Sequence, residues 1–245
     1  MTPYYDDGQC VIYHGDALDV LREVELTVDG VVTDPPYASG TRKESGKPSR
    51  GSMLRGEHAS NQRLSDPIDL DQMTTTGFVW VLRKVAMLSW DIIPDGGSFC
   101  SFIDWRQWPT LVGVLESCNY RVQNMVVWDK QNFGMGNGFR NQHELVCHAA
   151  KGVPDVHNRG TGNVITSVRV DPETVGHPSP KPDGLLGCLI DVVIPPGGVV
   201  LDPFMGAGST LRGAVARGRR AIGIERKEAY CEIAAKRLDQ GVLAL

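Results

Sequence analysis

The chain has 245 residues, of which 41% are hydrophobic and 22% are charged, as expected of one large globular domain with a sizeable core. No run approaches the roughly 18 apolar residues of a membrane span, and the N-terminus lacks the features of a signal peptide, so we expect a cytoplasmic protein with no membrane partner. The net charge of −4 does not by itself suggest nucleic-acid binding, and six scattered cysteines without a Cys-x-x-Cys pair argue against a disulfide framework or a metal site.

The first half of the chain alternates short apolar segments with longer helical ones. In chain order we predict a strand at 10–14, a helix at 16–24, a strand at 30–33, a helix at 71–93, a strand at 98–103, a helix at 105–117 and a strand at 120–128. The strand at 30–33 must end before Pro35 and Pro36, because proline cannot donate to a sheet. Residues 38–71 form a long polar segment, which inside a compact domain is usually functional or disordered.

The second half of the chain continues the alternation. We predict a glycine loop at 134–138, a strand at 143–149, an irregular segment at 153–180 with a short strand near 164–168, a helix at 181–194, a strand at 199–201, a helix at 209–217, a strand at 221–224 and a helix at 227–238. This pattern predicts an α/β fold with a mostly parallel, doubly wound sheet covered on both faces. In such sheets ligands bind beyond the carboxyl ends of the strands.

A glycine turn follows the predicted strand at 199–201. Gly206-Ala207-Gly208 opens a helix, and without Cβ atoms such a turn lets a nucleotide-like cofactor approach the backbone. A dinucleotide fingerprint needs a third glycine at position 211, which is Leu211, so a nicotinamide cofactor is disfavoured. Glu225 ends the next strand, where an acidic residue commonly accepts both ribose hydroxyls. The alternative for Glu225 is a helix cap.

A second motif, Asp34-Pro35-Pro36-Tyr37, follows the strand at 30–33. A carboxylate and a rigid turn carbonyl can each accept one hydrogen of an exocyclic NH₂ group, which aims the nitrogen lone pair at an electrophile. The aromatic ring offers a stacking surface for a planar base, worth about 1–3 kcal/mol. The alternative is a plain Asp-Pro turn with a surface tyrosine. Both motifs follow strands, which places an amine site and a cofactor loop on one edge of the sheet.

With these two motifs in this order, the chain resembles the S-adenosylmethionine-dependent DNA amino-methyltransferases of the permuted β-type. In that family the catalytic half precedes the cofactor half, and the resemblance implies a circularly permuted, Rossmann-like methyltransferase fold in a single domain, 1–245. Residues 15–18 resemble the acidic element near the cofactor's adenine, and residues 224–226 resemble the ribose-binding strand end. Residues 177–182 resemble the family's His-Pro-x-Gln-Lys-Pro segment, with Pro180 in place of Gln. Residues 143–146 resemble the strand that closes the catalytic half.

The resemblance assigns roles to individual residues. The catalytic residues are Asp34, Pro35, Pro36 and Tyr37. The residues that would bind S-adenosylmethionine are Asp16, Asp202, Phe204, Gly206, Gly208, Ser209, Glu225, His177 and Lys181. Lys181 either approaches the methionine carboxylate or merely starts a helix, and His177 either shapes the cofactor site or is structural. The implied partner is double-stranded DNA, from which the target base must be flipped, and family members often dimerise.

The expected DNA contact is a basic segment on an acidic chain. Residues 42–63 carry a local net charge of +4, from Arg42, Lys43, Lys47, Arg50, Arg55 and Arg63 against two glutamates. Arg140 after the glycine loop either lines the base pocket or begins a strand. Residues 153–176 are the short candidate for target recognition. The compact size fits a solitary or phage-type methylase slightly better than a restriction–modification partner.

Adenine N6 is the expected target, because within the family Asp at position 34 favours adenine and Ser favours cytosine N4. Cytosine N4 is the closest alternative, followed by an RNA or protein amide. A ring-carbon cytosine methyltransferase would need a nucleophilic cysteine, typically after proline, and no cysteine here follows one. A catalytically inactive nucleic-acid-binding module is disfavoured, because Asp34, Tyr37 and Gly206 are intact.

Overall fold

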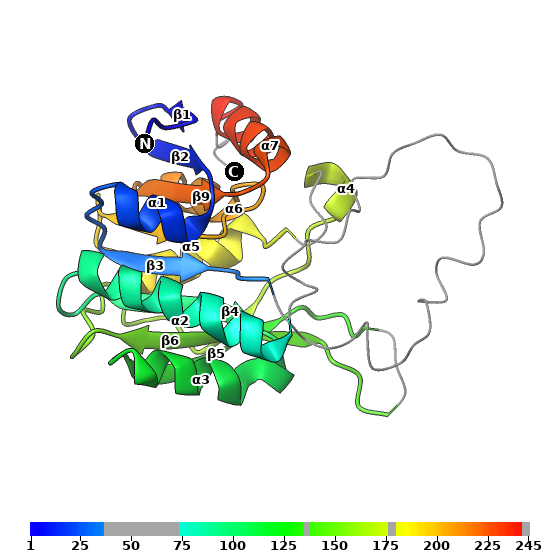
Figure 1. The fold of residues 1–245 in the computed structure, drawn as a ribbon. Helices are drawn as coiled ribbons and strands as arrows, with labels where there is room; N and C mark the ends of the chain where they lie inside the picture. Colours follow the sequence, from blue (N-terminus) through cyan, green and yellow to red (C-terminus); the bar gives the residue numbers. More distant parts are fainter. Residues whose placement is uncertain (37–73, 135–137, 176–179, 242–245) are drawn as a thin grey trace.

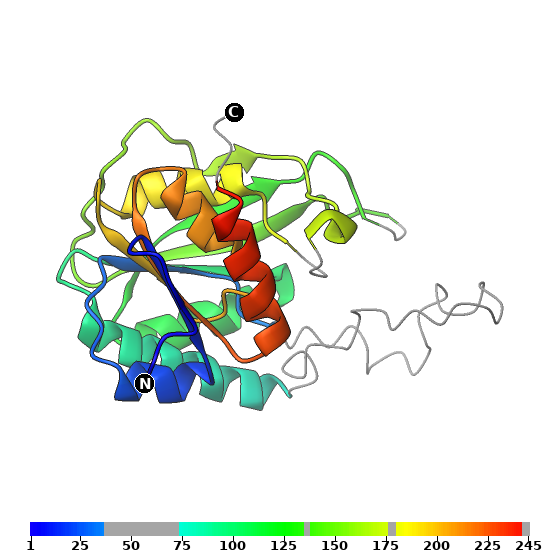
Figure 2. The ribbon, with the colours of Figure 1, turned by 90° about the horizontal axis from the view of Figure 1, so that it is seen from above.

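A computed structural model describes residues 1–36, 74–134, 138–175 and 180–241 of the chain. It contains one sheet with helices packed on both faces (Figures 1 and 2). The elements are β1 (Tyr5–Asp6), β2 (Cys10–His14), α1 (Ala17–Glu23), β3 (Gly30–Thr33), α2 (Thr75–Ile92), β4 (Ser98–Ile103), the 3₁₀ turn η3 (Trp105–Gln107), α3 (Trp108–Ser117), β5 (Arg121–Asp129), β6 (His143–Ala150), β7 (Val164–Thr166), α4 (Pro172–Val175), α5 (Asp183–Val193), β8 (Val199–Asp202), α6 (Ser209–Val215), β9 (Arg220–Glu225) and α7 (Glu228–Asp239).

The sheet has the strand order β1-β2-β9-β8-β3-β4-β6-β5-β7. Five of its neighbouring pairs are parallel, whereas β1 pairs antiparallel with β2, and β6 pairs antiparallel with both β4 and β5. The predicted α/β class with a mostly parallel sheet is therefore confirmed. Because β6 reverses between β4 and β5, these two strands run in the same direction and end on the same edge as β3.

Two apolar cores flank the sheet. One contains buried residues of α1, α2 and α3, and the other contains buried residues of α5, α6 and α7. Figure 2 shows these two groups of helices on opposite faces of the sheet, as doubly wound folds require. Every residue of β3, β4 and β8 is buried, as expected of strands covered on both faces.

The helix starts follow from local capping. The Asp16 side chain accepts a hydrogen bond from the Leu18 amide and caps α1, and Thr74 does the same for α2 through the Gly77 amide. The second cap explains why α2 begins later than the predicted residue 71. The predicted helix at 105–117 is divided into η3 and α3, because Pro109 lies in the first turn of a new helix, where its missing N–H costs nothing.

Some elements lie outside the sequence prediction. The two-residue strand β1 and the single-turn helix α4 carry too few residues for a periodic pattern. The predicted short strand near 164–168 is present as β7, which pairs in parallel with β5. The whole 38–71 segment, with Tyr37 before it and His177 later in the chain, lies outside the described residues. Among the described helices, none has both the length and the apolar character needed to cross a membrane.

Candidate active site

The two sequence motifs meet at the carboxyl ends of adjacent strands. β3 and β8 are parallel neighbours, so Asp34, which follows β3, lies on the same edge as Asp202, the last residue of β8. The hydroxyl of Thr33 donates to Asp202 Oδ1 at 2.7 Å, and the Phe204 amide donates to the same oxygen at 3.0 Å. Asp202 therefore ties the start of the amine motif to the start of the cofactor loop.

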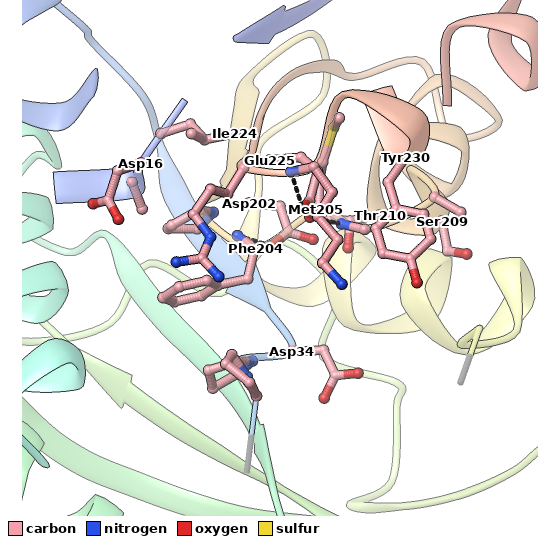
Figure 3. A pocket seen from close by; sticks show the side chains of 18 of the residues that line it. Asp16, Asp34, Asp202, Phe204, Met205, Ser209, Thr210, Ile224, Glu225 and Tyr230 are labelled. Carbon is pink, nitrogen blue, oxygen red and sulfur yellow. Dashed lines mark hydrogen bonds between the residues drawn. The ribbon is translucent and has the colours of Figure 1, made fainter. Parts of the chain in front are cut away.

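A cavity of about 430 Å³ opens at this edge and is lined by residues of both motifs. Figure 3 shows Asp34 apart from Asp16, Ile224 and Glu225, which border another part of the same cavity. Ten residues predicted to be functional line it: Asp16, Asp34, Pro35, Pro36, Lys181, Asp202, Phe204, Gly206, Ser209 and Glu225. Residues far apart in sequence thus share one site, as a two-substrate enzyme requires.

The glycine loop uses its two glycines differently. Gly206 has φ +50° and Gly208 has φ +76°, in the left-handed region that glycine adopts without strain. Gly206 lines the cavity, whereas Gly208 faces α7. A Cβ added at Gly208 would lie 2.8 Å from the Ala234 Cβ. The structure therefore gives Gly208 the role of closing the loop onto α7, rather than a place in the cavity wall.

The Glu225 carboxylate holds the cofactor loop at the end of β9. It accepts hydrogen bonds from the Gly206 amide at 3.2 Å and the Lys227 amide at 2.7 Å. Burial raises the pKa of Glu225, and these amide donors only partly oppose the effect of burial. Glu225 therefore orders the turn that leads into α7 and also lines the cavity, and its contact with the ribose hydroxyls stays a prediction.

Lys181 lies in the cavity wall, but its ammonium is paired with Asp34. Glu144 Oε2 of β6 lies 3.4 Å from the same ammonium, and Lys130 binds the other Glu144 oxygen at 2.5 Å. Burial lowers the pKa of Lys181, but Asp34 and Glu144 outweigh burial and the net pKa is raised. Burial raises the pKa of Glu144, but Lys181 and Lys130 outweigh it and the net pKa is lowered. Lys181 and Glu144 are therefore charged.

Several cavity residues were missed by sequence reasoning. Trp80 and Val81 come from α2, and Thr210 comes from α6. Lys227 immediately precedes α7, and Tyr230 lies within α7. Thr210 stands next to the predicted Ser209 in the helix that the glycine turn opens, so its position was a usable signal. No local pattern distinguishes Trp80 from a core tryptophan. Arg140 is exposed and lies outside the cavity lining, with its guanidinium 4.0 Å from the Phe133 ring centroid.

The buried Asp202 predicts a pH-dependent stability. Burial raises the pKa of Asp202 from 3.8 to about 6, so the native state holds its proton more tightly than the unfolded chain. This contribution to stability is fully present below about pH 3.8 and is lost as the pH rises through about 6. We expect Asp202→Asn to remove this dependence. Urea unfolding at a series of pH values should show the wild type losing about 2–3 kcal/mol relative to the variant between pH 4 and pH 6.5. A constant difference between the two proteins would contradict the assignment.

Comparison with known proteins identifies a family. The model of a family described as DNA methylase, N6_N4_Mtase, matches residues 28–236. The chain is similar to the Type II methyltransferase M2.DpnII of Streptococcus pneumoniae, with 27% identity over 261 residues, 97% of this chain and 92% of the relative. It is also similar to the Type II methyltransferase M.HinfI of Haemophilus influenzae, with 27% identity over 282 residues, 97% of this chain and 70% of the relative.

Solved structures share the fold. The crystal structure of an M1.HpyAVI–SAM complex superposes with a TM-score of 0.67 at 22% identity, covering 94% of this chain and 99% of that one. The PvuII DNA methyltransferase, described as cytosine-N4-specific, superposes with a TM-score of 0.71 at 16% identity, covering 98% of this chain and 90% of that one. At these identities the likeness concerns the fold of the chain.

Proposed function

Because this chain belongs to the family of DNA methylases that act on exocyclic amino groups, we propose that it transfers a methyl group from S-adenosylmethionine to N6 of an adenine flipped out of double-stranded DNA. One observation carries the proposal: Asp34 and the glycine loop open into the same cavity. The order of the two motifs, amine site first, is the one that the sequence resemblance implied.

The cavity residues suit S-adenosylmethionine. Glu225 presents a carboxylate to the ribose hydroxyls, Gly206 allows close approach of the backbone, and Asp16 offers an acceptor to the adenine end. When bound, S-adenosylmethionine supplies a methyl group on a positively charged sulfur, which a neutral amine can attack. A solved methyltransferase structure of the same fold contains this cofactor. Ser209 at the start of α6 adds a hydroxyl to the methionine side of the site.

Asp34 and Pro35 hold the target amine. The Asp34 carboxylate and the Pro35 carbonyl accept the two amine hydrogens, which directs the nitrogen lone pair toward the methyl carbon. As the new N–C bond forms and the carbon–sulfur bond breaks, the nitrogen releases one proton, for which Asp34 is the nearest assigned acceptor. Tyr37 stacks on the flipped base in this proposal. A carboxylate has about four acceptor positions, so its contact with Lys181 is compatible with binding the amine.

The choice of adenine as the target base depends on the identity of the residue at position 34. Asp34 favours adenine within the family, while the fold is shared with a methyltransferase described as cytosine-N4-specific. The direct test is to incubate the protein with unmethylated genomic DNA and S-adenosylmethionine, followed by nucleoside mass spectrometry. N6-methyladenine supports the proposal, whereas N4-methylcytosine would retain the mechanism and replace the base. If neither forms although the cofactor binds, the substrate is an RNA or a protein amide instead.

We further propose that DNA lies across the active-site edge of the sheet. The loop after β5 carries two exposed aromatic rings, Phe133 and Phe139, and the Arg140 guanidinium stacks on the first of them. Arginine and aromatic side chains together suit a strand with charged phosphates and planar bases. The basic segment 42–63 and the segment 153–176 complete the proposed contact. Figure 1 shows α4, within the latter segment, on the side toward which β3 points.

Replacing Arg140 should weaken DNA binding without affecting the cofactor. We expect Arg140→Ala to lower DNA affinity about tenfold at low salt and to reduce the slope of log K against log salt by about one, as loss of one phosphate contact does. Fluorescence anisotropy over a salt series measures both quantities. Arg220→Ala is the matched control, because Arg220 is exposed at the amino end of β9, on the opposite edge of the sheet. Equal losses in the two variants would refute a specific role for Arg140.

A further inference from the structure

Four charged side chains of alternating sign lead into the active site. Lys130 follows β5, Glu144 lies in β6, Lys181 precedes α5 and Asp34 follows β3. Lys130 binds Glu144 Oε1 at 2.5 Å, Glu144 Oε2 lies 3.4 Å from the Lys181 ammonium, and Lys181 binds Asp34 Oδ2. This series of ion pairs therefore links the ends of β5, β6 and β3 and the start of α5, and it ends at the Asp34 carboxylate.

Lys181 is the most enclosed member of this series. Its side chain is 5% exposed, and its ammonium lies 5.1 Å from the ring centroid of Phe102, on β4. A buried ammonium is costly unless anions surround it, and a buried ion pair is weak support for stability because desolvation offsets the attraction. A requirement for a fixed orientation of the Asp34 carboxylate explains these buried ion pairs better than a gain in stability does. Asp34 is 25% exposed and lines the cavity, so the fixed end faces the substrate.

We propose that Lys181 is a positioning residue for Asp34, and that Glu144 with Lys130 positions Lys181. This inference rests on the proposed function, since it assigns Asp34 to the target amine. The Lys181 ammonium donates a hydrogen bond to Asp34 Oδ2, and Glu144 Oε2 holds it from another side as an ion-pair partner at 3.4 Å. The rotamer of Asp34 is thereby set before the base arrives, which is the orientation that methyl transfer requires. The sequence offered two other roles for Lys181, approach to the methionine carboxylate or simply the start of a helix. A cofactor contact and a positioning role predict different effects of the same substitution on cofactor affinity.

The charges around Asp34 predict a shift of the pH–rate profile. Lys181 is the cation that contacts it, while Glu144 and the buried Asp202 are the nearby acids. Lys181→Met removes the cation that contacts Asp34 and leaves Lys130 paired with Glu144. The loss of the adjacent positive charge favours the protonated form of the Asp34 carboxyl. We expect Lys181→Met to move the acid limb of the methylation rate upward by about one pH unit or more. A role limited to packing would leave that limb in place.

The test compares four variants of the full chain by single-turnover methylation of DNA and by calorimetric titration with S-adenosylmethionine. We expect Lys181→Met to lower the methylation rate about 100-fold while cofactor affinity changes less than about threefold. Lys181→Arg keeps the charge and should recover part of the rate with a normal acid limb. Glu144→Gln retains Lys181 but removes the negative charge that holds its ammonium, and we expect the methylation rate to fall about tenfold. Lys236→Met, at an exposed i,i+4 pair of α7, is the control.

Each outcome decides the proposal. If Lys181→Met loses cofactor affinity by the same factor as methylation rate, Lys181 is a cofactor-binding residue and the inference is overturned. An unchanged rate and acid limb would overturn it as well. If Lys181→Met does not fold by thermal melting, Glu144→Gln alone decides, because it retains the lysine. A wild-type protein that methylates no DNA refutes the proposed function, whereas an active wild type with an equally active Lys181→Met refutes only the positioning role.

Discussion

Replacing Asp34 with alanine is expected to lower the methylation rate by a factor of about 10²–10³ or more, because the target amine loses a preorganised acceptor. Cofactor affinity should stay close to the wild-type value, since Glu225 and the glycine loop lie in another part of the cavity. Nucleoside mass spectrometry after incubation with genomic DNA gives the rate, and calorimetric titration with S-adenosylmethionine gives the affinity. Asp34→Ala should therefore lose methylation rate while it keeps its affinity for S-adenosylmethionine.

Two further variants make this prediction specific. Asp34→Ala also removes the partner of the buried Lys181, so a lower melting temperature is expected with it. Asp34→Asn keeps the shape and one acceptor oxygen, and should retain the fold while losing most of the rate. Asp19→Ala removes an exposed carboxylate from α1, outside the cavity, and should leave both measurements unchanged. Full activity in Asp34→Asn would refute a catalytic carboxylate at this position.

The proximity of the two motifs could be predicted from the sequence because it depends on strand ends. A parallel sheet places the residues after its strands on one edge, so Asp34 and Asp202 were expected together although they are far apart in the chain. The hydrogen bond from Thr33 to Asp202 agrees with that expectation. Nothing beyond the apolar strand pattern and the glycine and proline residues after it was needed.

The partner of Lys181 could not be predicted in the same way. The motif around residue 181 indicated a site residue, but the direction of a lysine side chain depends on tertiary contacts that no local pattern encodes. Its partner Glu144 belongs to β6, which runs antiparallel to β4 and β5, so the amino end of β6 lies at the edge where those two strands end. Gly208 is a similar case. Its glycine pattern indicated close approach, and the structure shows that the approaching group is Ala234 of α7.

Replacing Glu225 is expected to have the largest effect on cofactor binding. A carboxylate that accepts both ribose hydroxyls makes two charge-assisted hydrogen bonds, each worth about 1.5–3 kcal/mol. Glu225→Ala should therefore raise the dissociation constant for S-adenosylmethionine by at least about 10²-fold, measured by calorimetric titration. Glu225→Gln should cost less, because one acceptor remains. Glu228→Gln is the matched control, since Glu228 is exposed in the first turn of α7 and lies outside the cavity lining.

A loss of affinity alone would not prove contact with the ribose, because Glu225 also holds the Gly206 and Lys227 amides. A cofactor analogue lacking the ribose 2′-hydroxyl separates the two roles. If Glu225 contacts the hydroxyl, the wild type should bind the analogue about tenfold or more weakly, and Glu225→Ala should bind both compounds equally. If Glu225 only orders the loop, the wild type and the variant should discriminate equally between the two compounds. The second result would move the ribose contact elsewhere in the cavity and leave Glu225 as the residue that shapes the glycine turn.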